Sequence, residues 1–350
     1  MNSMVKNVLQ FLLFFGVGLG ILYLVYVNQS NAYQEDCILK GLDSENCSLV
    51  KKVIADFKSV NYFWIFLAWI AFNISNFSRA FRWKMLLNSI GHQPKISNAF
   101  MAVLVGYFAN LGLPRLGEVV RAATISKYEN IPVDQTVGTI VTDRVIDVLS
   151  ILTVTFLALI IEYEVIINFF TSNINLSEKL SGVKVLGIFG AIFVFAIVLI
   201  KKYWNPKGLI ATRIKKFGLG LKQGILSISK IKRPWVFILH SINVWLMYFF
   251  MAYFCFLAFA PTAHLSPVVA LVVYVFGSWG VVIPSPGGMG TYHFLAQSAL
   301  SLYGVSGEDG FSWANISFFS LQISASVFLG IISLILLPLF NKKKKDVTLE

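Results

Sequence analysis

Long apolar runs constrain this chain more than any other feature. Residues 137–161 and 314–338, for example, are long enough to cross a bilayer as helices, which takes about 20 apolar residues. Of the 350 residues, 57% are hydrophobic and only 13% are charged, too few to cover a soluble core. A helix satisfies its own backbone hydrogen bonds in lipid. The sequence therefore predicts an all-α polytopic membrane protein.

The apolar runs predict about six transmembrane helices in a single integral membrane domain, residues 1–340, followed by a basic tail at 341–350. Lys6 precedes the first run and no A-x-A cleavage site follows it, which indicates a retained helix rather than a signal peptide. The predicted spans are 8–27, 61–78, 137–161, 183–200, 235–259 and 314–338.

Positive charge is unevenly distributed between the predicted loops. The net charge of +12 is better explained by the enrichment of Lys and Arg in cytoplasmic loops than by a nucleic-acid partner, which we do not expect. If both termini and the loops 79–96, 127–136 and 201–233 are inside, that side holds 20 of the 29 Lys/Arg and 4 of the 17 Asp/Glu. This predicts a multi-pass protein of the inner (plasma) membrane with cytoplasmic N- and C-termini.

The loop 201–233 has a pattern of its own. It holds ten Lys/Arg and no acidic residue, and its apolar residues recur at helical spacing. Such a segment is typical of an amphipathic helix that lies on the anionic cytoplasmic leaflet.

Two apolar segments are interrupted by helix-breaking residues. The first, about 97–126, breaks at Gly112–Pro114, and the second, about 266–303, breaks at PSPGGMG, residues 284–290. With the orientation above, the first segment begins and ends inside, and the second begins and ends outside. We therefore predict two opposed re-entrant helical hairpins, the mark of an inverted-repeat transporter core. Their tips should line a shared cavity.

Charged residues follow the first break at predicted membrane depth. Such residues are costly in lipid and are tolerated mainly where they face a cavity or pair with one another. The six charges sum to zero, so they predict an electrically balanced polar site. They are Arg115, Glu118, Arg121, Asp143, Arg144 and Asp147.

Arg115 and Arg121 offer planar donors that suit a phosphodiester headgroup. Glu118 lies three residues from each, so all three can share a helix face. Glu118 would hold an arginine in place or accept a hydrogen bond from the headgroup. Two interpretations stay open, and both can hold: a headgroup site, or a structural salt-bridge network that fastens the hairpin to the next span.

Asp143 and Asp147 lie one helical turn apart, which suggests metal binding, acid–base chemistry or charge compensation. We favour counter-ions for Arg115 and Arg121, because a buried charge needs a partner and no His or Cys stands at ligand spacing nearby. Arg144 points away from its flanking acids and would contact the headgroup. We expect no metal and no cofactor.

The second tip is rich in proline and glycine. Pro284 and Pro286 lack backbone donors, and the glycines free the backbone. The helix that restarts after them would present unpaired N–H groups, which form an anion site. We therefore include Pro286, Gly287, Gly288 and Gly290 in the predicted substrate site.

His293 follows this tip and also belongs to the predicted site. A histidine titrates near neutral pH and could couple transport to protons. It could equally be a packed residue that caps its helix. Both interpretations stay open.

Cys37 and Cys47 lie ten residues apart in a polar loop. They are a candidate disulfide if this loop is extracytoplasmic, since disulfides persist in oxidising compartments. The spacing alone does not decide whether the bond forms.

Three strings resemble one known family: NLGLPRLGEVVRA at 110–122, DRVIDVLSI at 143–151 and IPSPGGMGTYHF at 283–294. They are similar to the flippase-like membrane region of the lysylphosphatidylglycerol synthases and its stand-alone relatives. The resemblance covers essentially the whole chain and is most specific at GE-x-x-R, 117–121, and D-R-x-x-D, 143–147. It implies a lipid flippase or another role in lipid transport.

The chain departs from this family in two respects. No soluble aminoacyl-transfer domain follows its last predicted span, so we do not expect lysyl transfer from tRNA. His293 stands where many relatives carry a Glu shortly after the glycine-rich break, which leaves the role of that position open.

We predict a lipid flippase or lipid transporter that moves a phosphate-containing headgroup through a charged cavity. The alternative is a membrane transferase acting on a lipid-linked substrate, or an accessory protein that recruits an envelope enzyme through 201–233. Transport is favoured because the sequence shows no nucleophile constellation and no nucleotide-binding loop. The expected partners are membrane lipids with anionic or phosphate-bearing headgroups. The oligomeric state stays open, and a homodimer is compatible with the sequence.

Overall fold

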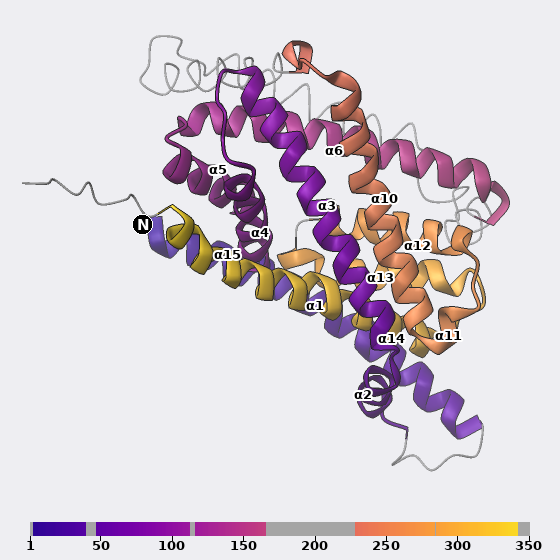
Figure 1. Ribbon diagram of the computed structural model, residues 1–350. Coiled ribbons are helices and arrows are strands. Elements are labelled where there is room, and N and C mark those ends of the chain that lie inside the picture. Colours follow the sequence, from indigo (N-terminus) through magenta and orange to yellow (C-terminus); the bar gives the residue numbers. More distant parts are fainter. Residues whose placement is uncertain (1–2, 40–46, 113–115, 166–227, 284, 342–350) are drawn as a thin grey trace, which may run out of the picture.

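The computed structural model describes residues 3–39, 47–112, 116–165, 228–283 and 285–341. Every regular element in these ranges is a helix, as the sequence predicts (Figure 1). The α-helices are α1 Ser3–Leu39, α2 Leu49–Ser59, α3 Tyr62–Ser89, α4 Ile96–Gly112, α5 Leu116–Glu129, α6 Val133–Ile161, α10 Pro234–Ala258, α11 Ala260–Ala263, α12 Pro267–Val282, α13 Thr291–Ser301, α14 Gly307–Ser317 and α15 Ser326–Phe340; two 3₁₀ turns, η2 Ile228–Lys230 and η3 Pro286–Gly288, and a π-helix, η4 Phe318–Ala325, complete the set.

Within the described residues, three helices are long and apolar enough to cross a membrane. They are α6, α10 and the continuous helix Gly307–Phe340 that α14, η4 and α15 form together. The pair α2–α3, bent by 80°, makes a fourth span if it is counted as one. The predicted span 183–200, most of the basic segment 201–233 and nearly all of the tail 341–350 lie outside the described residues.

Helix α3 corrects the predicted loop 79–96. The helix does not end near residue 78 but continues to Ser89. Arg79 and Arg82, which the charge count assigns to a cytoplasmic loop, are buried within it, with 3% and 0% exposure. They need no contact with water because carboxylates of another helix pair with them.

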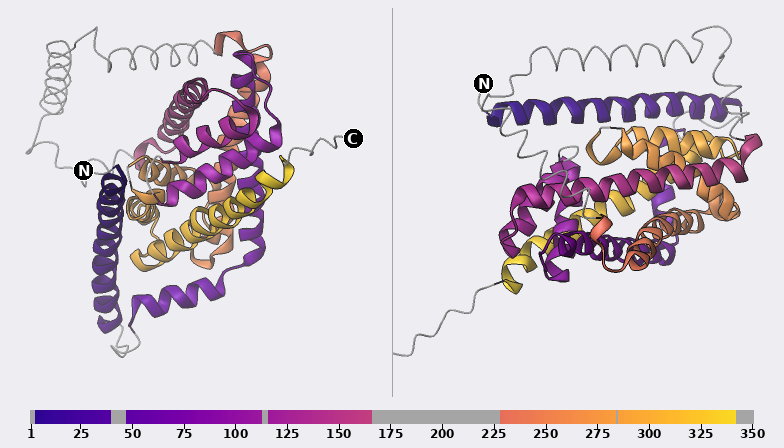
Figure 2. Two further views of the ribbon diagram at one scale, coloured as in Figure 1. Left: turned by 90° about the vertical axis from the view of Figure 1, so that its left-hand side faces the viewer. Right: turned by 90° about the horizontal axis from the view of Figure 1, so that it is seen from above.

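Helix α1 also extends beyond its predicted bounds of 8–27. It continues to Leu39, and the residues between 28 and 39 contain no proline or glycine that would end it. Figure 2 shows α1 along one side of the bundle, where it packs against α13 and α14.

Helices α4 and α5 form a tightly closed antiparallel pair. Near their connection, Gly106 and Gly117 bring the two backbones into contact, and a Cβ atom on Gly117 would clash with the Gly106 carbonyl and approach Asn110 Nδ2 to 2.6 Å. At the far end, the Asn98 amide donates to Glu129 at 2.6 Å. The chain thus returns on itself between residues 112 and 116, at the predicted break.

Helices α12 and α13 form a second antiparallel pair. A Cβ atom on Gly280 would lie 2.7 Å from the Cα of Tyr292, so the backbones touch here as well. The turn contains Gly287, Gly288 and Gly290 with φ of 61°, 85° and 83°, a region that glycine enters without a steric cost. The predicted role of these glycines in freeing the backbone is confirmed.

The end of α4 lies next to the second turn. A Cβ atom added to Gly287 would lie 3.1 Å from Leu111, at the end of α4, and 3.5 Å from Gln322, in the π-helix. The widened helix at 318–325 also presents the Ser320 carbonyl to the Trp69 indole N–H, at 2.8 Å. A π-helical turn of this kind often marks a functional position.

The two ends of the helix 307–340 identify two ends of the molecule. At its start, Asp309 binds Lys52 at 2.6 Å. Just after its end, Asn341 bonds Asn98, which in turn bonds Glu129. The pair α4–α5 therefore begins and ends at the same end of the molecule.

Candidate functional site

Two carboxylates of α6 meet two arginines of α3 in the interior. Asp147 lies 2.6 Å from Arg79 Nη1 and 2.6 Å from Arg82 Nη2. Asp143 accepts from Arg82 Nε at 2.8 Å. Because 79 and 82 are three residues apart and 143 and 147 four, each pair lies on one helix face. The four side chains interlock and fix α3 to α6.

This pairing corrects the predicted partners of the two acids. The sequence assigns them to Arg115 and Arg121. In the structure, Arg79 and Arg82 contact both acids. Arg115 lies outside the described residues, so its predicted role stays a prediction.

Arg121 adds α5 to the network. Its Nη1 donates to Asp143 at 3.0 Å, as expected for this pair. Its guanidinium lies over the ring of Trp83, 3.8 Å from the centroid, a close cation–π contact. Trp83 is itself held by a hydrogen bond to Thr139 of α6 at 3.0 Å. Arg121 is thereby positioned by three helices.

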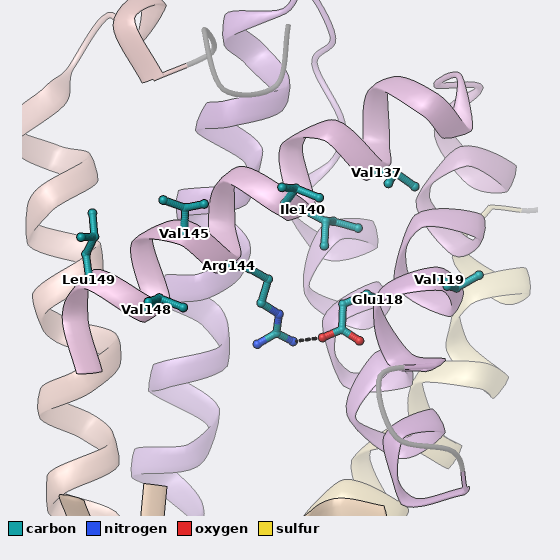
Figure 3. A pocket seen from close by; sticks show the side chains of 9 residues that line it. Glu118, Val119, Val137, Ile140, Arg144, Val145, Val148 and Leu149 are labelled. Carbon is teal, nitrogen blue, oxygen red and sulfur yellow. Dashed lines mark ion pairs between the residues drawn. The ribbon is translucent and has the colours of Figure 1, made fainter. Parts of the chain in front are cut away.

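Arg144 and Glu118 form the outer part of the network. Arg144 Nη2 lies 2.5 Å from Glu118 Oε1, and Figure 3 shows the two side chains reaching toward each other from α6 and α5. Arg144 Nη1 also lies 3.5 Å from Asp147, which corrects the prediction that Arg144 points away from both of its flanking acids. Its side chain is 44% exposed, whereas Asp143 is completely buried. Glu118 thus holds an arginine in place, which is one of its two predicted roles.

Two tyrosines complete the polar interior. Arg79 Nη2 donates to the Tyr248 hydroxyl at 3.2 Å, and this hydroxyl shares a hydrogen bond of 2.7 Å with Tyr107. Tyr248 lies on α10 and Tyr107 on α4, so the network reaches five helices.

The network has spare donors and a net positive charge. Four arginines (79, 82, 121 and 144) face three carboxylates (118, 143 and 147), which leaves +1 within the described residues. The predicted neutral set omits Arg79 and Arg82 and includes Arg115, which lies outside these residues, so its balance stays a prediction. Arg121 Nε and Nη2 are buried without a hydrogen-bond partner among the described residues, as are Arg79 Nε and Arg82 Nη1. Buried donors without partners are unusual and costly. The arrangement can therefore accept an anion.

Two hollows adjoin the network. The larger, about 380 Å³, lies between α5 and α6, and the smaller, about 20 Å³, lies among Arg79, Tyr107, Asn110 and Arg121. Glu118 and Arg144 line both. The glycines of the second turn line neither, so these hollows are not the predicted cavity between the two tips.

The second turn is closed by its own contacts. The Thr291 hydroxyl donates to the Gly280 carbonyl at 2.6 Å, and the Ser285 hydroxyl lies 3.2 Å from the Thr291 hydroxyl. His293 Nδ1 accepts the Gly290 N–H at 3.4 Å, and its ring packs on Phe318 with centroids 4.7 Å apart. His293 therefore caps its own helix, whereas coupling to protons stays a prediction. Binding of an anion at Pro286, Gly287, Gly288 and Gly290 also stays a prediction.

Cys37 and Cys47 are buried thiols in the structure, without a disulfide between them. Both lie near Tyr33 of α1.

Arg79 and Arg82 are the functional candidates that sequence reasoning missed. A signal was available: apolar and aromatic residues continue beyond residue 78 through Ala80, Trp83 and Leu86 at helical spacing. This helical spacing was overlooked because the charge count assigned every arginine near the end of a span to a cytoplasmic loop.

These observations define a multi-pass helical membrane protein whose interior holds an arginine–carboxylate network. The lysylphosphatidylglycerol synthase TM region family matches residues 48–324, and the chain belongs to this family. A UPF0104 membrane protein from Methanocaldococcus jannaschii is 32% identical over 99 residues, which cover 27% of this chain and 30% of that relative. The matched part thus spans less than a third of the relative's length. No solved structure matches the chain.

Proposed function

We propose that this protein is a lipid transporter of the flippase type, which binds a phosphate-bearing headgroup at the buried arginines while the acyl chains stay in the bilayer. One observation carries the proposal. Arg121 is 4% exposed and is fixed by Asp143 and Trp83. Among the described residues, two of its donor atoms have no partner, and the network around it has a net charge of +1. A guanidinium with free planar donors suits a phosphate.

The antiparallel helix pairs support the same proposal. We interpret α4–α5 and α12–α13 as re-entrant hairpins that enter from opposite faces of the inner membrane, in a core with about six spans. Asn98 at the start of α4, Glu129 at the end of α5 and Asn341 lie together at one end of the molecule, which agrees with a hairpin that returns to its starting side. The enrichment of Lys/Arg in the predicted inner loops favours cytoplasmic termini even with Arg79 and Arg82 excluded.

Transport follows from exposing the arginines to each leaflet in turn. Asp143 and Asp147 stay bound to Arg79 and Arg82 and keep their charges compensated. Arg121 and Arg144 hold the headgroup, since each has donor capacity beyond its carboxylate contacts. The end of α4 at Leu111 lies next to Gly287, and relative movement of the two helix pairs at this contact would open the path.

The test is transbilayer movement of a fluorescent phosphatidylglycerol in phosphatidylcholine vesicles that contain the purified protein. Wild type should accelerate it. Arg121→Lys keeps the charge opposite Asp143 but loses the spare planar donors. A hydrogen bond to a charged group contributes about 1.5–3 kcal/mol, so we expect the rate to fall by about 10-fold or more.

Lys127→Gln is the matched control, because it removes a cation from the exposed side of the same helix. Its rate should equal wild type. Equal rates in wild type and a correctly folded Arg121→Lys variant would contradict the assignment of Arg121.

A further inference from the structure

A groove on the surface between α5 and α6 ends at the Glu118–Arg144 ion pair (Figure 3). Its volume of about 380 Å³ falls in the range of small-molecule sites. Apart from the ion pair, the described residues that line it are all valine, isoleucine or leucine. Val119 and Val148 are 60% and 55% exposed. Because α6 is long and apolar enough to cross the membrane, we expect these exposed side chains to lie at membrane depth.

The ion pair separates this groove from the inner hollow. Glu118 and Arg144 line both spaces. The inner hollow, about 20 Å³, holds no more than about one water, so a headgroup cannot enter it while the pair is closed. Behind the pair lies Arg121, two of whose donor atoms have no hydrogen-bond partner in the part of the chain that the structure describes.

Glu118 is held less firmly than the other acids of the network. Its Oε1 binds Arg144, but its Oε2 has no hydrogen-bond partner among the described residues. Asp143, in contrast, is bound by Arg82 and Arg121. Of the three carboxylates, Glu118 is the one that an incoming anion can displace.

We propose that the groove is a lateral entrance for an acyl chain of a phospholipid, and that the Glu118–Arg144 pair is the gate that its phosphate opens. The aliphatic walls suit a hydrocarbon chain, and the net charge of +1 draws an anion to the inner end. The phosphate replaces Glu118 on Arg144, and the displaced carboxylate opens the way to Arg121. This inference rests on the proposed function, and the tests below distinguish a failure of the entrance from a failure of the transport function.

The entrance is tested with a phosphatidylglycerol that carries a photoreactive diazirine in one acyl chain, in phosphatidylcholine vesicles, followed by mass-spectrometric mapping. Labelling should concentrate on the groove residues of α5 and α6. Val148→Trp fills the groove, and we expect at least 5-fold less labelling there and at least 5-fold slower lipid movement. Leu157→Trp is the control, because Leu157 lies on the same helix with 48% exposure but does not line the groove.

The gate is tested with Glu118→Gln, which keeps the shape of the side chain but removes its charge. Lipid movement should become several-fold faster, because Arg144 no longer has to exchange a carboxylate for the phosphate. A slower rate in a folded Glu118→Gln protein overturns the gate.

The remaining outcomes decide between the two proposals. Labelling spread evenly over all lipid-facing helices, or unchanged labelling and movement in Val148→Trp, overturns the entrance while the transport function stands. Groove labelling in a wild-type protein that moves no lipid overturns the transport function while the entrance stands. Cross-links between two copies of α6 that Val148→Trp abolishes show that a second copy occupies the groove, which also overturns the entrance.

Discussion

The two antiparallel helix pairs share one mode of closure but differ in what their buried positions carry. In both, a glycine of one helix lies against the backbone of the other: Gly117 against Gly106, and Gly280 against Tyr292. Only the first pair carries charge, since residues 267–301 contain no Lys, Arg, Asp or Glu. Close packing is therefore a common requirement of the fold, whereas the chemistry belongs to α4–α5 and its neighbours α3 and α6.

The largest difference in stability between changes near the two helix pairs should come from Asp143→Asn. This change removes the carboxylate that faces three arginines in a fully buried position. We expect a loss of about 3–5 kcal/mol in the free energy of unfolding, the usual result of leaving buried charges unpaired. Denaturation of the detergent-solubilised protein measures it.

The matched change in the second pair is Thr291→Val, which removes the hydroxyl that binds the Gly280 carbonyl. Its cost should be about 1 kcal/mol, because a neutral hydrogen bond contributes that much. Equal losses in the two variants would show that the network is no more important for stability than an ordinary buried hydroxyl.

The common mode of closure is tested by replacing the contact glycines. In Gly117→Ala and Gly280→Ala, the new Cβ meets atoms of the opposite helix at 2.6–2.8 Å or closer. We expect each to lose roughly 1–3 kcal/mol of stability, the range for overpacking. Gly112→Ala is the control, because no atom of the described residues lies within 4 Å of its added Cβ. A loss confined to one pair would mean that the two close differently.

Sequence reasoning predicted the helical class, both breaks and most of the charged residues, because each has a local signal. Apolar runs give the spans, and the positions of proline and glycine give the turns, as at Gly287, Gly288 and Gly290. The contact between Gly106 and Gly117 depends on how two helices pack against each other, so it has no local signal in the sequence.

The ion-pair partners within the network could not be predicted either, because they too depend on how two helices pack against each other. Asp143 and Asp147 were recognised as counter-ions, but the identity of their arginines depends on how α3 crosses α6. The charge count placed Arg79 and Arg82 in water, because it assigned every arginine near the end of an apolar run to a loop, although the helical spacing of apolar residues continues to Leu86. Neither the π-helix at 318–325 nor its contact with Trp69 has a recognisable pattern in the sequence.

The smallest effect, and the one that most sharpens the contrast between the pairs, concerns His293. Glutamine at this third helical position reaches back to the N-cap N–H in a capping box, so His293→Gln should keep the bond from Gly290. His293→Ala should lose about 1 kcal/mol with the cap. If capping is what this side chain contributes, vesicles with His293→Gln will move fluorescent phosphatidylglycerol at the wild-type rate from pH 5 to pH 8, since glutamine does not titrate. A pH dependence present in wild type and absent in His293→Gln would instead assign proton coupling to the second pair, and the chemistry would then be divided between both.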